Sequence, residues 1–311
     1  WCRHGYYLNE RPLFTADPLF HAGAYYVQEA SSMFLWQALE QCVAQDSVVL
    51  DLSAAPGGKS TLISQFLNSN GLLVSNEIVR SRAYILAENM IKWGNANCLV
   101  SNNSPADFAR LPSFFDVIVV DAPCSGEGMF RKDAGAIDEW SESNVLMCAE
   151  RQRDILASVW DSLKTGGTLI YSTCTYNRFE NEDNVNWIAK ELGAEVLKID
   201  VGQFPEITIS ESGYRFLPHK TRGEGFFLSV LRKTADAPEL RVKKKRNEKQ
   251  AVKIEPAILN LRNQLMQPET WEIAIYDNSI VAIPLAHVEK LGLLKNMLKV
   301  LHAGIVLAEQ K

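Results

Sequence analysis

Val48-Val-Leu-Asp-Leu-Ser-Ala-Ala-Pro-Gly-Gly-Lys-Ser60 is the stretch that decides the fold, because it joins an apolar run to a glycine-rich turn. The run 48–52 is typical of a buried strand, and residues 59–67 after the turn are typical of a helix. A glycine-rich turn between a strand and its helix lies at the carboxyl edge of a parallel sheet, where such folds bind nucleotides. We therefore expect a ligand site at this turn.

The same alternation continues along the chain. Apolar runs predict further strands at 72–77, 98–100, 115–121 and 168–172. Helical spacing predicts helices at 80–93 and at 144–163, the latter stopped by Gly166-Gly167, and Asn177 with Glu180 is typical of a capping pair that opens another helix. Near-continuous apolar strands alternating with helices predict a mostly parallel sheet covered on both faces. The fold class is α/β, doubly wound and Rossmann-like.

Composition excludes several classes of protein. The chain has 311 residues, of which 47% are hydrophobic and 22% charged, so it can bury a large core and is neither disordered nor collagenous. No apolar run reaches the roughly 18 residues of a membrane span, which predicts a soluble protein. The six cysteines contain no CxxC, which argues against structural zinc and a disulfide framework and favours a reducing cytoplasm. Because the chain opens with Trp1, we interpret it as a fragment.

Charge is divided unevenly between segments. The net charge is −5, yet residues 215–253 carry +8 and the remainder −13. The basic run Arg241-Val-Lys-Lys-Lys-Arg246 suits phosphates, although a solvated linker is the simpler interpretation. We expect a main domain at 1–233, a basic linker at 234–254 and a small α+β module at 255–311. In that module, strands 271–276 and 279–283 flank Asp277-Asn278 as a hairpin, and a helix follows at 287–299.

Two ligands compete for the glycine-rich turn. Residues 53–60 nearly match the phosphate-binding motif G-x-x-x-x-G-K-[ST], with Ser53 in place of the first glycine. Pro56 weakens that interpretation, because it removes one backbone N–H from a loop that must present N–H groups to phosphates. The alternative ligand is S-adenosylmethionine (SAM), which has an adenosine but no phosphate. Glu77, at the end of the second strand, can accept both of its ribose hydroxyls.

Two further loops each place a cysteine at the same sheet edge. They are Asp121-Ala-Pro-Cys-Ser-Gly-Glu-Gly128 after the fourth strand and Ser172-Thr-Cys-Thr175 after the fifth. A cysteine is usually a small buried hydrophobe, but two at a ligand-binding edge in Gly/Pro/Ser-rich loops favour a chemical role. Neither has a role in a P-loop enzyme, which favours SAM.

Together these motifs resemble the Nol/Nop/Sun RNA cytosine-5 methyltransferases. The residues that carry the resemblance are Asp51 to Lys59, Asp121 to Gly126 and Ser172 to Thr175, with Tyr26-Val-Gln-Glu-Ala-Ser-Ser-Met33 and Arg222-Gly-Glu-Gly-Phe-Phe227 similar to its bacterial RsmF-like ribosomal RNA branch. The resemblance covers about residues 1–233 and implies a Rossmann-like methyltransferase fold, SAM as donor and a cytosine in RNA as acceptor. Residues 255–311 would be an accessory RNA-binding module.

The resemblance also implies the site residues. Cys174 would add to carbon 6 of the cytosine, Cys124 would assist loss of the carbon 5 proton and release of Cys174, Asp121 would bind the Watson–Crick edge, and Lys59 would favour the thiolate. The expected cofactor-binding residues are Ser53, Ala54, Ala55, Pro56, Gly57, Gly58, Lys59, Glu77, Arg82, Asn103 and Asp121. The chain departs from the family after its third strand, where Val100-Ser-Asn-Asn-Ser-Pro105 lacks the usual acidic residue, so Asn103 or Ser104 would bind the adenine instead.

Several alternatives stay open at this point. The same chemistry on tRNA, a P-loop ATPase and a non-catalytic ribosome-assembly factor that binds RNA through residues 215–253 each fit part of the pattern. A DNA cytosine methyltransferase would take its nucleophile from the Pro-Cys loop, making Cys124 the attacking thiol. We expect a cytoplasmic monomer that acts on ribosomal RNA or a ribosomal subunit and holds no metal.

Overall fold

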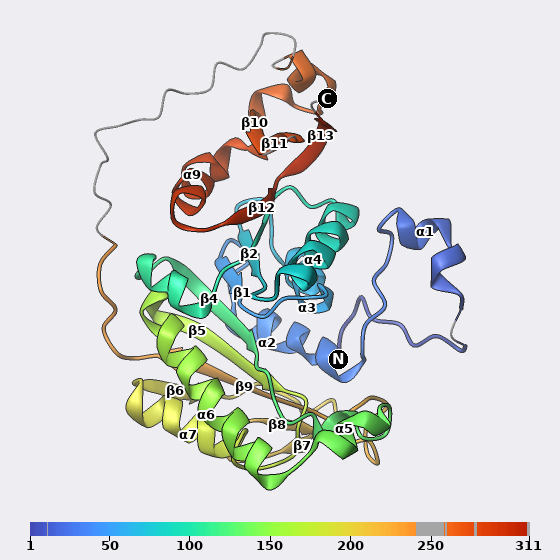
Figure 1. Ribbon diagram of the computed structural model, residues 1–311, viewed down its shortest axis with the longest axis vertical. Helices are drawn as coiled ribbons and strands as arrows, with labels where there is room; N and C mark the ends of the chain where they lie inside the picture. The colour runs from blue at the N-terminus through green and yellow to red at the C-terminus, as the bar shows by residue number, and fades with distance from the viewer. Residues whose placement is uncertain (11, 241–257, 259, 277–278, 310–311) are drawn as a thin grey trace.

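The computed structural model describes residues 1–10, 12–240, 258, 260–276 and 279–309 (Figure 1). Its described helices are α1 (Pro18–His21), α2 (Leu35–Cys42), α3 (Gly58–Phe66), α4 (Arg80–Trp93), α5 (Ala134–Glu139), α6 (Glu142–Val159), α7 (Glu182–Glu191) and α9 (Val288–Met297). The strands of the main sheet are β1 (Val48–Asp51), β2 (Leu72–Asn76), β3 (Cys98–Ser101), β4 (Phe115–Asp121), β5 (Leu163–Thr173), β6 (Ala194–Leu197), β7 (Thr208–Ile209), β8 (Tyr214–Phe216), β9 (Phe226–Lys233) and β12 (Val300–Ala303). A second sheet contains β10 (Trp271–Tyr276), β11 (Ser279–Pro284) and β13 (Ile305–Glu309).

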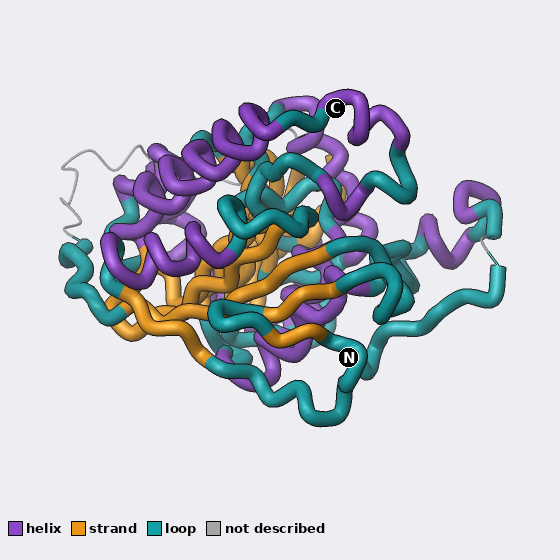
Figure 2. The backbone as a smooth tube through the Cα atoms, turned by 90° about the horizontal axis from the view of Figure 1, so that it is seen from below, coloured by secondary structure: helices purple, strands orange, loops and turns teal. Residues whose placement is uncertain are grey.

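The main sheet confirms the doubly wound α/β prediction. Its order is β12-β3-β2-β1-β4-β5-β9-β8-β7, with β6 also paired to β9. The five strands from β3 to β5 are parallel, while β9 and β12 pair antiparallel at either side of them. Figure 2 shows helices on both sides of the strands. Neighbouring residues of β1 pack into the hydrophobic cores on opposite faces of the sheet, Val49 into one and Leu50 into the other.

The segment after α6 differs from the prediction. The expected helix 144–163 ends at Val159, and β5 already begins at Leu163. Gly166 and Gly167 lie inside this strand rather than stopping the helix. The pairing with β4 shifts register here, and Gly166 takes φ +76°, a conformation that favours glycine. The two glycines therefore form an irregularity within β5.

The expected capping pair Asn177–Glu180 was also wrong as a helix start. Helix α7 begins at Glu182 and its preceding residue is Asn181. Asn177 and Glu180 still bond each other, since Glu180 N–H donates to Asn177 Oδ1 at 2.9 Å. Asn177 Nδ2 in turn donates to Glu180 Oε1. The two hydrogen bonds order a turn in which the Glu180 carboxylate points inward and is fully buried.

The C-terminal residues extend the main sheet. β10 and β11 form the expected antiparallel hairpin, although its turn, Asp277-Asn278, lies outside the described residues. β12 pairs antiparallel with β3, and Ile283, Leu291 and Leu294 join the core on one face of the main sheet. The basic run Arg241–Arg246 and most of the expected linker also lie outside the described residues. Within the described part of the chain, no helix could span a membrane.

Candidate functional site

Three loops at the carboxyl edge of the sheet converge on Asp121. β1, β4 and β5 are parallel neighbours, so the loops that follow them meet at one edge. The Lys59 Nζ atom, from the first turn of α3, lies 2.8 Å from Asp121 Oδ2. The Ser172 hydroxyl, at the end of β5, donates to Asp121 Oδ1 at 2.8 Å. Each motif singled out in the sequence therefore supplies one member of a single cluster.

The two cysteines of these loops are in direct contact. The Sγ atoms of Cys124 and Cys174 are 3.0 Å apart, and the Cys174 N–H donates to Cys124 Sγ at 3.3 Å. The hydrogen bond from the Cys124 thiol, aided by the Lys59 ammonium, holds the pKa of Cys174 below its usual range, against burial and the charge of Asp121. The same contact with Cys174, together with burial, raises the pKa of Cys124. Cys174 is therefore the thiol disposed to ionise, and Cys124 is the one that keeps its proton.

Glu180, whose buried carboxylate binds the residue that follows Cys124, is a residue that the sequence interpretation did not place in the site. Glu180 accepts hydrogen bonds from the Ser125 hydroxyl at 2.5 Å and from Gln152 Nε2 at 2.7 Å. The available signal was Gln152, a polar residue on the otherwise apolar stripe of α6 that contains Cys148 and Leu156. A polar residue in such a stripe must find a buried partner.

The glycine-rich turn between β1 and α3 is held by the second strand and the next helix. The Ala54 N–H donates to Asn76 O at 2.8 Å, and Arg82 Nη2 donates to Ala55 O at 2.8 Å. Gly57, before the first residue of α3, has φ +122°, which a residue with a Cβ rarely adopts. The Arg82 side chain therefore supports the turn by binding the backbone of Ala55. The expected cofactor loop also contains Ser53, Pro56 and Gly58.

Glu77 lies just beyond the end of β2, as the sequence predicts. Its side chain is only 4% exposed, Oε1 accepts the Val79 N–H at 2.9 Å, and Oε2 lies 3.5 Å from Arg82 Nη1. A carboxylate fixed at this edge can accept hydroxyl hydrogens from a ribose. Its placement fits the cofactor assignment.

Asp51, the last residue of β1, has an unsatisfied oxygen. Oδ2 accepts the Ser60 hydroxyl at 2.7 Å, but the buried Oδ1 has no hydrogen-bond partner among the described residues. Burial raises the pKa of Asp51 to about 7. A buried acceptor at the ligand edge suits the ammonium group of SAM. The residues present therefore fit this cofactor, with Glu77 for its ribose and Asp51 for its ammonium.

The Asn103 side chain meets the C-terminal segment. Its Oδ1 accepts the Lys299 N–H at 3.0 Å and its Nδ2 donates to Lys299 O at 3.3 Å. The Ser104 hydroxyl is likewise engaged, donating to Asp107 Oδ2 at 2.8 Å. Both side chains expected to bind the adenine are thus occupied by protein groups in this structure. Asn103 is occupied because the residue before β12 reaches the loop that follows β3, and Ser104 is occupied by Asp107 of its own loop.

Two motifs about 190 residues apart in the sequence meet beside the cysteines. The Glu29 carboxylate accepts the backbone N–H groups of Ser31 and Glu224, at 2.9 and 2.8 Å, and the Ser31 hydroxyl donates to Glu224 O at 2.8 Å. The segment 222–227 then approaches Gly128 closely, since Gly225 N–H donates to Gly128 O at 3.3 Å. The N-terminal motif therefore braces the loop that carries Cys124.

Gly128→Ala is expected to disrupt this contact. A Cβ at this position would lie 2.5 Å from Gly225 O and 2.8 Å from Cys174 O, both of which are backbone atoms. We expect a loss of about 1–3 kcal/mol in the free energy of unfolding, together with loss of methyl transfer. Thermal unfolding and activity measure both effects. Gly292→Ala is the control, because a Cβ there meets nothing within 4 Å, and unchanged activity in Gly128→Ala would contradict the packing argument.

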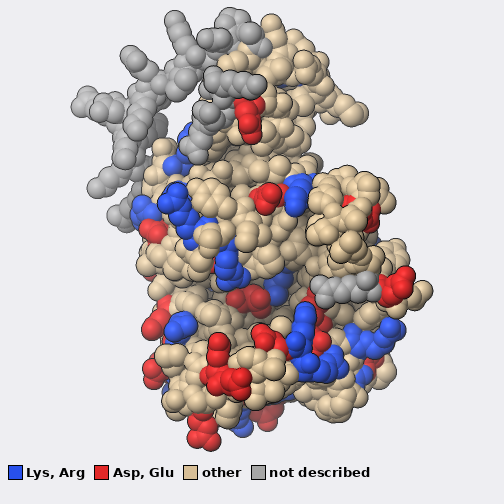
Figure 3. Space-filling view, turned by 45° about the vertical axis from the view of Figure 1, so that its right-hand side comes forward, with Lys and Arg blue, Asp and Glu red and all other residues tan. Residues whose placement is uncertain are grey.

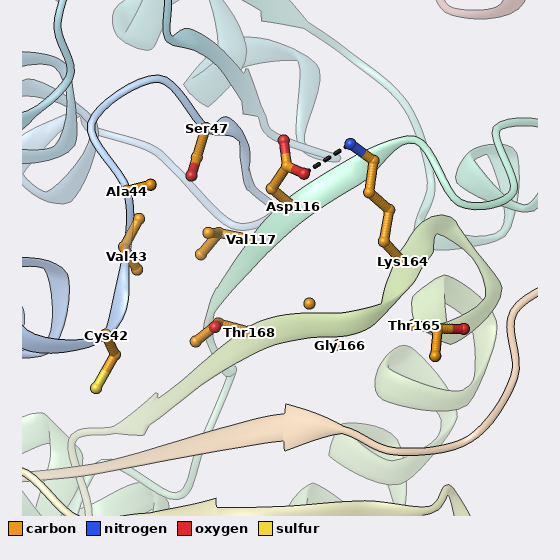
Figure 4. A pocket seen from close by; sticks show the side chains of 11 residues that line it. Cys42, Val43, Ala44, Ser47, Asp116, Val117, Lys164, Thr165, Gly166 and Thr168 are labelled. Atoms are coloured by element: carbon orange, nitrogen blue, oxygen red, sulfur yellow. Dashed lines mark hydrogen bonds and ion pairs between the residues drawn. The ribbon is translucent and has the colours of Figure 1, made fainter.

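A separate pocket lies at the opposite edge of the sheet. Its volume is about 210 Å³, and the Asp116–Lys164 ion pair of 2.6 Å crosses it at the amino ends of β4 and β5 (Figure 4). It contains none of the residues that the sequence singled out for the site.

The charges on the face drawn in Figure 3 are mixed, since Lys and Arg are interspersed with Asp and Glu among its described residues. The described part of this face therefore has no continuous basic field.

Comparisons with known proteins agree with this geometry. Residues 38–232 match the family described as 16S rRNA methyltransferase RsmB/F, and residues 1–30 match the N-terminal domain of 16S rRNA methyltransferase RsmF. Ribosomal RNA small subunit methyltransferase F of Pectobacterium atrosepticum is 38% identical over 77% of this chain and 51% of its own length; the Vibrio cholerae protein of that name is 34% identical over 99% and 68%.

Among solved structures, NSun6 from Pyrococcus horikoshii with SFG matches with a TM-score of 0.63 and 30% identity, over 73% of this chain and 57% of that one. A methyltransferase homologue protein from the same organism matches with a TM-score of 0.59 and 29% identity, over 72% and 73%.

The shared sheet and the ligand edge define the class, which is that of the SAM-dependent methyltransferases. Within that class, this chain belongs to the RsmB/F family of 16S rRNA methyltransferases. It spans about half the length of the Pectobacterium relatives that it matches.

Proposed function

We propose that this chain transfers a methyl group from SAM to carbon 5 of a cytosine in RNA, and that the RNA is that of the small ribosomal subunit. The contact between the Cys124 and Cys174 thiols at the cofactor edge carries the proposal. Methyl transfer to an oxygen or an amine requires no thiol, whereas carbon 5 of cytosine must first be activated by a nucleophile. We also propose that the protein acts as a monomer in the cytoplasm, with RNA as its partner and without a metal.

The first half of the reaction uses Cys174. Its thiolate forms a bond to carbon 6 of the cytosine, and the electron pair of the 5,6 double bond becomes available at carbon 5. Asp121, held by Lys59 and Ser172, accepts a hydrogen bond from the amino group on the Watson–Crick edge and so orients the ring for attack. Bound SAM supplies the electrophilic methyl group that carbon 5 takes up. The base must leave any stack to reach these groups.

The second half uses Cys124. The carbon 5 proton passes to water, its electron pair restores the double bond, and the pair of the carbon–sulfur bond returns to Cys174. The thiol of Cys124 donates a hydrogen bond to that departing sulfur, from which it is 3.0 Å away in this structure. Because bond breaking and proton loss belong to one elimination, stabilising the departing thiolate assists both.

Transfer of label from methyl-labelled SAM to a 16S rRNA transcript tests the proposal. Nuclease digestion of the product should yield labelled 5-methylcytidine. Label on another atom or on tRNA alone would overturn the stated substrate. Binding of ATP without binding of SAM would instead favour the P-loop interpretation of residues 53–60.

Asp51→Asn is expected to change how SAM affinity depends on pH. Below pH 7 the Asp51 carboxyl is mostly protonated, and above pH 7 it is a carboxylate that attracts the cofactor's ammonium. Wild-type affinity should therefore rise by up to roughly tenfold from pH 6 to pH 8. The Asn variant should bind more weakly at pH 8 and lack this rise. Titration calorimetry at both pH values measures it, with Asp107→Asn as the control, and an equal rise in the Asp51 variant would contradict the assignment.

A further inference from the structure

Both peptide groups that flank Cys124 are held by one buried network. On the C-terminal side, the Ser125 N–H donates to Glu180 Oε2 at 3.1 Å. On the N-terminal side, Pro123 O accepts Gln152 Nε2 at 3.0 Å, and the same Nε2 donates to Glu180 Oε2 at 2.7 Å. The backbone on either side of the thiol is therefore tied, directly or through one amide, to the Glu180 carboxylate.

The Glu180 carboxylate is buried among neutral donors. It is 0% exposed, and Asn177 Nδ2 donates to Oε1 at 2.6 Å beside the Ser125 hydroxyl. Among the described residues, no ion pair includes Glu180. Burying a carboxylate without a cation is costly, and hydrogen bonds must compensate for it. A glutamate that only caps a helix at the protein surface would not need these buried hydrogen bonds, because water solvates its carboxylate.

The network is itself anchored from below. Gln152 is fully buried, and its Oε1 accepts Asn184 Nδ2 at 2.7 Å and lies 2.8 Å from the Tyr171 hydroxyl. That hydroxyl lies 2.6 Å from Glu180 O. Three separate elements, α6, β5 and α7, therefore fix the position of the carboxylate.

We propose that Glu180 is the positioning residue for the release step, holding the loop so that the Cys124 sulfur stays against that of Cys174. This inference rests on the proposed function and deepens it. The negative charge of Glu180 also contributes to raising the pKa of Cys124, after the larger effects of Cys174 and of burial. Glu180 thus favours the protonated thiol that the departing Cys174 sulfur requires.

Glu180→Gln tests the inference, because the new amide brings an N–H group against the N–H donors of Ser125 and Gln152. With a 16S rRNA transcript and methyl-labelled SAM, we expect kcat to fall roughly 10²-fold while KM for SAM changes less than about twofold. Label that remains on the protein after nuclease digestion should rise roughly tenfold, because the methylated adduct is released slowly. A role limited to stability would lower the amount of active protein without trapping an adduct.

Glu182→Gln is the matched control. Glu182 is also a buried glutamate, two residues further along, but it pairs with Arg215 rather than with the Cys124 loop. We expect this variant to lower the unfolding temperature without increasing protein-bound label. If Glu180→Gln does not fold, Ser125→Ala removes a single hydroxyl from the network and should raise the trapped label roughly threefold.

A double variant separates this inference from the proposed function. If Glu180 acts through Cys124, Glu180→Gln combined with Cys124→Ala should trap the same amount of label as Cys124→Ala alone. The role of Glu180 would be overturned if the double variant traps more label than Cys124→Ala alone, in proportion to the two single effects. It would also be overturned if Glu180→Gln traps no label while Cys124→Ala does. If Cys124→Ala traps nothing either, the proposed roles of the cysteines fail instead.

Discussion

Cys174→Ala is expected to abolish methyl transfer, by roughly 10⁴-fold or more, and to leave no covalent protein–RNA adduct. Carbon 5 of cytosine is a poor nucleophile, and the adjacent Cys124 does not replace the missing thiolate, because burial and the charge of Glu180 still raise its pKa when Cys174 is absent. SAM should still bind, since Glu77 and Asp51 do not depend on the thiol. Label transfer, adduct formation on a denaturing gel and SAM titration measure the three properties.

Cys42→Ala is the matched control for that experiment, because Cys42 is also a half-buried free thiol but lies away from the cluster. It should retain wild-type transfer. Appreciable product from Cys174→Ala would mean that Cys174 is not the nucleophile. Loss of SAM binding in that variant would mean that the substitution disturbs the fold of the edge, and its inactivity would then carry no mechanistic meaning.

Cys124→Ala is expected to give the opposite phenotype, in which a methylated covalent adduct accumulates. The first bond still forms, because Cys174 and its neighbour Lys59 remain. Release slows because the departing sulfur loses the thiol that lies 3.0 Å away. We expect protein-bound label to become the main product and turnover to fall by roughly 10²-fold or more.

The pH dependence of adduct formation distinguishes this interpretation from a general disturbance. The hydrogen bond from Cys124 is the largest cause that lowers the pKa of Cys174. Its removal should raise that pKa, so that a smaller fraction of Cys174 is ionised at neutral pH and adduct formation moves to higher pH. An unchanged pH profile would contradict the pairing. If Cys124→Ala forms no adduct and Cys174→Ala traps one, the two roles are reversed.

The local pattern of apolar residues was sufficient to predict the bounds of several helices and strands around the site. The expected strand 115–121 and helix 80–93 match β4 and α4 in full, because an apolar run with clear boundaries leaves one buried arrangement. It fails at β5, because the pattern Gly166-Gly167 predicts a helix stop and the structure has a strand there. Glycine permits an irregularity inside a paired strand as readily as it ends a helix, and only the partner strand β4 determines which occurs.

The same division holds for the site residues. The loops containing Lys59, Asp121, Cys124 and Cys174 could be assigned to one edge because the carboxyl ends of neighbouring parallel strands meet. The spacing of Asn177 and Glu180 predicts an interacting pair, but it carries no information about Gln152 or Ser125. Their partners come from other elements, and hydrogen bonds of that range leave no periodic signal in a sequence.

The sequence by itself determined the doubly wound α/β class, the ligand edge and the two cysteines, since burial periodicity and turn chemistry are local properties. The tertiary structure alone decided which cysteine is disposed to ionise, because the pKa of each thiol depends on the distance to the other, to Lys59 and to buried carboxylates. It alone placed Lys299 against Asn103, because β12 had to find an open strand edge at β3. Charge and pairing across the fold depend on three-dimensional distance, which residue order does not specify.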